Sequence, residues 1–339
     1  MLCTMRQEEV RMTRNTFRKS GTNSLAFNVL KDNKGILIGL AILIIFTAVM
    51  NPEFLTSQNI LNVLRQTSIN MIVAIGVTLV IILGGIDLSV GSIMAASGVV
   101  TGGLIAYSGV SIWIAIIAGL LIGVIFGLIN GILTAYKFLP SFIVTLATMN
   151  IARGFAYVYT DGKPIRVMSD EFNFVGSGYV GGIIPMPVIY MLVIIIITSI
   201  LMNRTKLGRH IYAVGGNLEA AKFSGINTKK VQLYAFTISG FLAAFAGIVL
   251  ASRMFSGQPT AGEGAELDAI AAVVLGGTSL TGGSGRISGT VIGALIIGVL
   301  SNALNLMGVN SFWQYIIKGI VIIIAVYVDV SGKRKKNLT

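Results

Sequence analysis

Long apolar runs, separated by short polar or glycine-rich stretches, fill most of the chain. A helix needs about 20 apolar residues to cross the hydrocarbon core of a bilayer, and several runs approach or exceed that length. The pattern predicts an all-α polytopic membrane protein with about ten transmembrane helices, at least one of them broken or short. The expected helical segments are residues 35–50, 58–83, 88–108, 112–136, 141–159, 188–202, 231–251, 267–280, 287–307 and 312–328.

Two of these segments depart from a simple span. In the second, an amphipathic part precedes a nearly continuous apolar part, so we expect a break near residues 68–70. Residues 267–280 are too few to span comfortably, and we expect a half-helix or a short packed span there. Glu266 and Asp268 would lie at its positive amino-terminal end.

Glycines recur at four-residue spacing in the segment 112–136. Small residues at this spacing let two membrane helices approach closely. We therefore expect a helix-packing face that consists of Gly119, Gly123, Gly127 and Gly131.

The composition excludes an ordinary soluble protein. Of the 339 residues, 54% are hydrophobic and 11% are charged, and the mean hydropathy is +0.85. The net charge of +12 could suggest nucleic-acid binding in a soluble domain. Here, however, lysine and arginine gather at the chain ends and in a few loops, which is the pattern of cytoplasmic segments in membrane proteins. We expect contact with membrane lipid and no binding of nucleic acid.

The same charge pattern predicts the orientation and the domain organisation. Residues 1–34 form a basic cytoplasmic extension, residues 35–329 the transmembrane domain, and residues 330–339 a basic cytoplasmic tail. The loop 203–230 carries six lysines and arginines against the single acidic residue Glu219, so we place it in the cytoplasm.

No motif for catalysis is present in the sequence. The phosphate-binding pattern Gly-x-x-x-x-Gly-Lys-Ser/Thr and the Gly-x-Ser-x-Gly elbow are both absent. His210 is the single histidine, which excludes a multi-histidine metal site. We expect no catalytic residues, no metal, no cofactor bound by this chain, and no enzymatic activity.

The stretch Leu-Gly-Gly-Ile-Asp-Leu-Ser-Val-Gly-Ser at residues 83–92 places a carboxylate between two apolar runs. An ionisable group near lipid depth is costly and tends to be functional. A related phrase, Leu-Gly-Gly-Thr-Ser-Leu-Thr-Gly-Gly, occurs at residues 275–283, and both phrases fall on the cytoplasmic side of the predicted topology. Paired glycine-broken segments are typical of transport pathways. The pathway or gate candidates are Gly85, Asp87, Ser89, Gly91, Gly276 and Gly277.

Two structural alternatives explain the same residues. The glycines could serve only for turning and close packing of helices. Asp87 could be a buried helix cap that accepts hydrogen bonds from the backbone at Ser89 or Val90.

A short amphipathic helix is expected at residues 219–226, Glu-Ala-Ala-Lys-Phe-Ser-Gly-Ile, within the basic loop. Such a helix can be a plain connector or a docking element. Spelled Glu-Ala-Ala-x-x-x-Gly, it resembles the coupling motif through which permeases of ATP-binding-cassette importers engage their ATPase. The residues implied in coupling are Asn217, Glu219, Ala220, Ala221 and Gly225.

Several longer phrases resemble the permease subunit of ribose-type sugar importers. They are Gly-Ile-Asp-Leu-Ser-Val-Gly-Ser at 85–92, Tyr-Thr-Asp-Gly-Lys-Pro at 159–164, Gly-Arg-His-Ile-Tyr-Ala-Val-Gly-Gly-Asn at 208–217, and the run 258–286. The resemblance covers residues 37–329. It implies a pore in the bacterial plasma (inner) membrane that works with a separate ATPase subunit carrying Mg-ATP, an external sugar-binding protein and a second permease copy, most simply in a homodimer.

The implied function is the import of a simple sugar, ribose or a related monosaccharide. An ion-coupled secondary sugar transporter, with Asp87 as the ion site, is the alternative, and a passive channel is a further one. Sugar passage requires a wet route lined by neutral hydrogen-bonding groups, although amides buried in helix packing explain the same residues equally well. The candidates for the lining are Asn70, Thr145, Asn150, Asn302 and Asn305.

Overall fold

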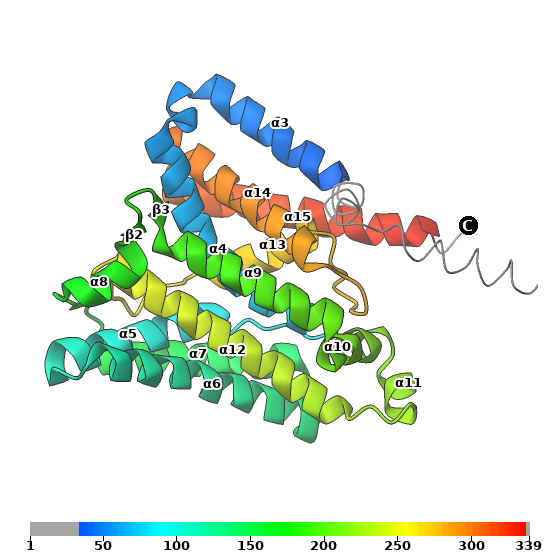
Figure 1. The fold of residues 1–339 in the computed structure, drawn as a ribbon. Coiled ribbons are helices and arrows are strands. Elements are labelled where there is room, and N and C mark those ends of the chain that lie inside the picture. The colour runs from blue at the N-terminus through cyan, green and yellow to red at the C-terminus, as the bar shows by residue number, and fades with distance from the viewer. Residues whose placement is uncertain (1–33, 337–339) are drawn as a thin grey trace, which may run out of the picture.

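The computed structural model describes residues 34–336, and it shows a bundle of helices that run roughly alongside one another (Figure 1). Nearly all of the predicted basic extension, and the end of the predicted basic tail, lie outside the described residues. The long helices are α3 (Lys34–Met50), α4 (Ser57–Ile82), α5 (Val90–Ser108), α6 (Ile112–Lys137), α7 (Ser141–Thr160), α9 (Met186–Arg204), α12 (Thr228–Arg253), α14 (Ile287–Leu306) and α15 (Ser311–Lys336).

Shorter elements connect the long helices. They are the 3-10 turn η1 (Pro52–Leu55) and the helices α8 (Asp170–Ser177), α10 (Lys206–Gly216), α11 (Leu218–Phe223) and α13 (Ala265–Leu275). Two small antiparallel ladders pair β1 (Ile165–Arg166) with β4 (Ser256–Gly257), and β2 (Tyr179–Val180) with β3 (Ile184–Pro185).

Seven helices within residues 34–336 are long and apolar enough to cross a membrane: α4, α5, α6, α7, α9, α12 and α14. The apolar stretches of α3 and α15 are shorter, and α13 has 11 residues. The structure thus confirms the mainly helical fold and the short segment predicted at residues 267–280.

The helices form an inner and an outer set. Of the most apolar 18-residue segment of α4, 83% of the residues are buried, whereas for α6 the share is 22%. Helix α12 packs against α4, α5 and α6, while α14 packs against α4 and α13. The centre of the molecule is therefore formed by α4, α5 and α12. The face that α6 turns away from them carries large exposed apolar side chains, as a lipid-facing surface requires.

The two ends of the bundle differ (Figure 1). One end, here called the α8 end, carries α8, β2 and β3. The opposite end, here called the α11 end, carries α10 and α11, and the start of α3 and the end of α15 also lie there.

The break predicted within the second segment is wrong, because α4 continues through residues 68–70. Ser68 lies within the helix, and its hydroxyl donates to the carbonyl oxygen of Leu64 at 2.6 Å. A serine that bonds back to its own helix needs no interruption of the backbone ladder. The helix ends later, at Ile82, and residues 83–89 form a non-helical connection, with a turn at Leu83 and Gly84, before α5 begins at Val90.

The glycine face predicted on α6 is confirmed. All four glycines are buried. Gly123 and Gly240 of α12 face one another so closely that a Cβ atom on either would meet the carbonyl oxygen of the other. A Cβ atom on Gly127 or Gly131 would likewise meet the α12 backbone.

A packing experiment follows from this contact. Gly240→Val is expected to lower the free energy of unfolding by about 1–3 kcal/mol or more, because the new side chain overpacks α6. Gly154→Ala is the matched control: Gly154 is exposed on α7, nothing lies within 4 Å of its added Cβ, and alanine favours a helix by about 0.5–1 kcal/mol. Thermal unfolding of the purified variants in detergent would measure both changes. A Gly240→Val variant as stable as the wild type would show that α6 and α12 are not in this close contact.

Candidate functional site

Asp87 lies in the non-helical connection, residues 83–89, between α4 and α5, and its side chain is 1% exposed. Its Oδ1 accepts hydrogen bonds from the Ser89 backbone N–H at 3.0 Å and from the Ser89 hydroxyl at 2.6 Å. Its Oδ2 accepts from the hydroxyl of Ser239, on α12, at 2.8 Å. The carboxylate therefore accepts three hydrogen bonds and links residues 83–89 to α12. The bond from Ser89 N–H is the cap-like contact that the sequence allowed as an alternative.

The polar cluster extends from Asp87 to two further helices. Asn130, on α6, donates its amide to Ser89 Oγ at 2.9 Å. The carbonyl oxygen of that amide accepts from the hydroxyl of Thr148, on α7, at 2.7 Å. All of these side chains are buried. We call Asp87, Ser89, Asn130, Thr148 and Ser239 the aspartate cluster; it joins α6, α7 and α12 through the interruption between α4 and α5.

The connection 83–89 is also hydrogen-bonded directly to α7. The Ser141 hydroxyl accepts from the backbone N–H of Ile86 at 3.1 Å, and the Thr145 hydroxyl donates to the carbonyl oxygen of Ile86 at 3.1 Å. Backbone groups that lack helical partners in an apolar bundle must find others, and these two side chains supply them.

A second non-helical connection, residues 254–264, follows α12 and consists of the two-residue strand β4 and several turns. Gly257 lies against Gly98 of α5, and Gly262 lies against Gly91 near the beginning of that helix. Seven helical residues separate these two contacts, so the stretch runs inward by about 10 Å at 1.5 Å per residue. It leads into α13, which starts inside the bundle rather than at its end.

Arg153 of α7 holds this second stretch in place. Its Nη1 donates to the carbonyl oxygens of Pro259 at 2.5 Å and Ala261 at 2.8 Å. The guanidinium thus faces protein groups, as a charge within an apolar helix requires. Glu263 and Glu266 lie near enough to attract it electrostatically.

The two interruptions have opposite directions. In the first, the long helix α4 is followed by the connection 83–89 and then by α5. In the second, the long helix α12 is followed by the connection 254–264 and then by α13. Since α4 and α12 run in opposite senses (Figure 1), the two arrangements are inverted with respect to one another. They meet where Gly91 packs on Gly262. Discontinuous helices of this kind, in inverted order, are typical of membrane transporters.

The two Leu-Gly-Gly phrases contact one another, but they are not corresponding parts of these arrangements. The backbone N–H of Gly283 donates to the carbonyl oxygen of Ile82 at 2.8 Å, and Gly282 lies against Gly84. Gly276 packs directly on Gly289 of α14, so close packing accounts for it. The structure thus brings Gly85, Asp87 and Ser89 together, whereas Gly276 and Gly277 belong to a separate turn.

The side chains predicted to line a passage are scattered. Asn302 and Asn59 exchange two amide hydrogen bonds, at 3.0 and 2.8 Å, which joins α14 to α4. Asn305 accepts a hydrogen bond from Gln314, and Asn150 is exposed and donates back to its own helix at Leu146. Packing therefore accounts for Asn302. Of the five, Asn70 lines a cavity, together with Gln66, Ile69, Leu250, Arg253 and Met254.

The α11 end carries the predicted coupling segment. Asn217 caps α11 by accepting from the Ala220 N–H at 2.9 Å, and Gly225 ends the turn with a φ of 79°. Ala221 is 4% exposed and faces the protein. Glu219 is exposed, and Phe223 is 87% exposed.

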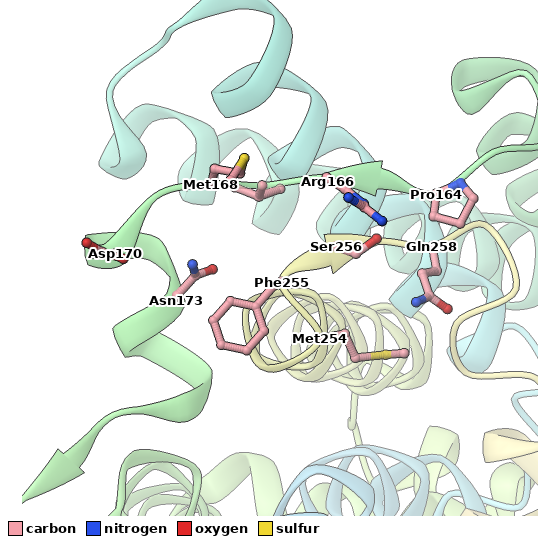
Figure 2. A pocket seen from close by; sticks show the side chains of 10 residues that line it. Pro164, Arg166, Met168, Asp170, Asn173, Met254, Phe255, Ser256 and Gln258 are labelled. Carbon is pink, nitrogen blue, oxygen red and sulfur yellow. The ribbon is translucent and has the colours of Figure 1, made fainter.

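The α8 end carries an open cleft of about 920 Å³ between the β1–β4 ladder and the start of α8 (Figure 2). Arg166, Met168 and Asp170 line one side, and Met254, Phe255 and Gln258 line the other. Met168 is 97% exposed. Among the described residues, no group of three or more His, Cys, Asp or Glu side chains is placed to hold a metal.

Sequence reasoning missed the hydrogen-bond partners of Asp87 and of the connection 83–89. Ser239, Asn130, Thr148 and Ser141 read as ordinary small polar residues within apolar runs. Asn130 carried a signal, since it lies three residues after Gly127 and seven after Gly123 and therefore shares the glycine face of its helix. The exposed Phe223 lay inside the predicted docking helix without being singled out.

These features define a multi-pass membrane transport protein of the permease class, in which interrupted helices meet inside an apolar bundle. Comparison with known proteins identifies the family: residues 59–326 match the model of the "Branched-chain amino acid transport system / permease component" family. The chain belongs to this family, and it is a transport permease rather than an enzyme.

Several curated relatives cover most of the chain. The ribose import permease protein RbsC of Bacillus subtilis (strain 168) is 51% identical over 313 residues, which are 92% of this chain and 95% of the relative. RbsC of Haemophilus influenzae is 48% identical over 86% of this chain and 91% of the relative. The xylose transport system permease protein XylH of Escherichia coli (strain K12) is 36% identical over 93% and 95%, respectively. No solved structure matches the chain.

Proposed function

We propose that the chain is the membrane-spanning permease subunit of an ATP-binding-cassette importer for a simple sugar, with ribose as the cargo. The identity of about half of all residues to ribose import permeases, over nearly the whole chain, supports the class of cargo. The observation that carries the importer mechanism is α11, a short and separately capped helix with an exposed glutamate and an almost fully exposed phenylalanine.

The proposed partners follow from this arrangement. A separate ATPase subunit, which binds Mg-ATP, docks on α11 through Glu219 and the segment Asn217 to Gly225. A sugar-binding protein delivers cargo to the cleft at the α8 end. A second copy of the permease completes the translocation unit as a homodimer.

The proposed orientation places the α11 end in the cytoplasm of a bacterium and the α8 end outside its plasma (inner) membrane. Basic residues gather at the α11 end, on the segments Arg204 to Arg209 and Lys222 to Lys230, as cytoplasmic loops require. Both ends of the described chain lie at that end (Figure 1), which supports cytoplasmic termini and ten membrane-embedded segments, with α3, α13 and α15 added to the seven long apolar helices.

Transport in this proposal uses movement rather than a tight site. ATP-driven closure of the ATPase subunit displaces α11, and the displacement reaches α12 directly, since α12 begins five residues after α11 ends. Helix α12 carries Ser239, which bonds to Asp87 in the connection 83–89, and α12 leads directly into the connection 254–264. Both connections therefore shift with α12. The ion-coupled alternative gains no support, because both oxygens of Asp87 already accept hydrogen bonds.

Co-purification of the tagged chain from its own membranes tests the proposal. We expect an ATPase subunit to accompany it, and the ATPase activity to rise when a ribose-loaded binding protein is added. A panel of other pentoses and hexoses identifies the cargo. A chain that purifies alone and moves sugar alone in vesicles would contradict the importer mechanism.

A further inference from the structure

A cavity of about 350 Å³ lies between α4 and α12, near the end of α12. One face of α4 supplies Gln66, Ile69 and Asn70, and one face of α12 supplies Leu250, Arg253 and Met254. Both triplets have the spacing i, i+3, i+4, so each helix presents a single face to the cavity. The volume falls in the range of about 300–1,000 Å³ that is usual for small-molecule sites.

Three of the lining side chains have hydrogen-bonding groups that the protein does not use. Within residues 34–336, the amides of Gln66 and Asn70 and the guanidinium of Arg253 make no hydrogen bond or ion pair to other groups. All three residues are partly buried. Polar groups in such places pair with something, and groups that converge on a cavity unpaired are available to a ligand.

The lining selects the class of ligand. Amides both donate and accept hydrogen bonds, whereas a guanidinium only donates, which suits neutral hydroxyl groups that also do both. A cation is disfavoured by Arg253. Arg253 is the one cation among the residues that line the cavity. The neighbouring Arg65 donates a hydrogen bond to Tyr179 and stacks over its ring at 5.0 Å, while its buried Nε has no hydrogen-bond partner among the described residues. An anion is therefore the competing ligand, which the phosphate probe below tests. The side chains of Ile69, Leu250 and Met254 add the apolar surface that the C–H face of a sugar contacts.

We propose that this cavity binds a monosaccharide within a single permease chain during translocation, with Gln66, Asn70 and Arg253 as its hydrogen-bonding residues. The inference rests on the proposed sugar-importer function. Met254 lines both this cavity and the cleft of Figure 2, so the site lies directly next to the surface where cargo is proposed to arrive.

Protection of a thiol in the cavity tests the proposal. Leu250→Cys, in a Cys3→Ser background that removes the single native cysteine, places a thiol in the lining and leaves the three polar side chains intact. We expect ribose at millimolar concentration to slow labelling by a methanethiosulfonate reagent at least threefold, in the full chain reconstituted in nanodiscs. Adding Asn70→Leu is expected to remove the protection. Lys163→Cys, at an exposed position of the α8 end, is the control and should label at the same rate with and without ribose.

Inorganic phosphate is the second probe. Protection by phosphate but not by ribose would overturn the proposal and identify an anion site instead. Equal labelling rates with and without ribose would also overturn it.

A transport measurement separates this inference from the proposed function. In the assembled importer, Gln66→Leu and Asn70→Leu are expected to lower ribose uptake about tenfold while the ATPase stays stimulated by the loaded binding protein. Gln58→Leu, an identical change of an exposed residue at the start of α4, should leave uptake unchanged. If the wild-type complex imports ribose and the cavity variants equal it, the cavity inference fails alone. If the wild-type complex imports no ribose, the proposed function fails.

Discussion

Replacing Asp87 with leucine is expected to prevent stable folding of the chain and to abolish uptake. The change leaves the Ser89 backbone N–H and the Ser89 hydroxyl without their acceptor in a fully buried setting, while the Ser239 hydroxyl can turn to its own helix. Each unsatisfied buried group costs about 1–3 kcal/mol, so the total is about 2 kcal/mol or more. This is a large part of the stability of a typical protein. Fluorescence-detected size-exclusion chromatography after heating would measure the loss.

Asp87→Asn is the discriminating control. The asparagine oxygen can accept both bonds from Ser89, and its amide can donate to Ser239, whose hydroxyl then turns to its own helix. We therefore expect folding, and uptake within about threefold of the wild type, since a rearranged hydrogen bond costs about 0.5–1.5 kcal/mol. A well-folded Asp87→Asn protein that moves no sugar would contradict this structural role and would make the carboxylate the leading candidate for an ion site.

Charge reversal on α11 is expected to separate folding from transport. Glu219→Lys and Phe223→Asp alter exposed side chains, so thermal stability should stay within about 0.5 kcal/mol of the wild type. An exposed aromatic and a charge at the centre of an interface can each carry binding energy of about 2 kcal/mol. We expect each change to lower ATPase association, measured by titration of the purified subunits, by at least about tenfold, and uptake to fall with it.

Met168→Asp is the matched control for Phe223→Asp. Met168 is 97% exposed, but it lies at the opposite end of the bundle. It should leave ATPase association unchanged. Gly225→Pro is a poor probe of docking, because residue 225 has a φ of 79°, which proline cannot adopt, and its N–H donates to the carbonyl oxygen of Lys222. Normal ATPase binding by both α11 variants would remove the argument that α11 is the docking element.

Local patterns in the sequence were enough to predict the membrane class and most helices. Hydrophobicity and length are properties of consecutive residues, and the four-residue spacing of glycines from Gly119 to Gly131 directly describes one helix face. The short helix predicted at residues 219–226 is present as α11 for the same reason, since such a helix is encoded by residues a few positions apart. The resemblance to sugar-importer permeases, which rested on quoted phrases, agrees with the family to which the chain belongs.

The tertiary structure decided which polar groups meet. Ser68 stays helical because its hydroxyl bonds back to Leu64 within α4. The interruption after Ile82, in contrast, coincides with the glycines that the sequence already placed between two segments. Asp87 finds Ser239 across 152 positions of sequence, and Asn302 finds Asn59 across 243. The sequence by itself determined which segments are apolar enough to form the helices of the bundle, because hydrophobicity is a property of consecutive residues. The packing of helices distant along the chain determined which buried polar groups become partners, because a polar group in an apolar bundle must be satisfied by whatever helix is packed beside it.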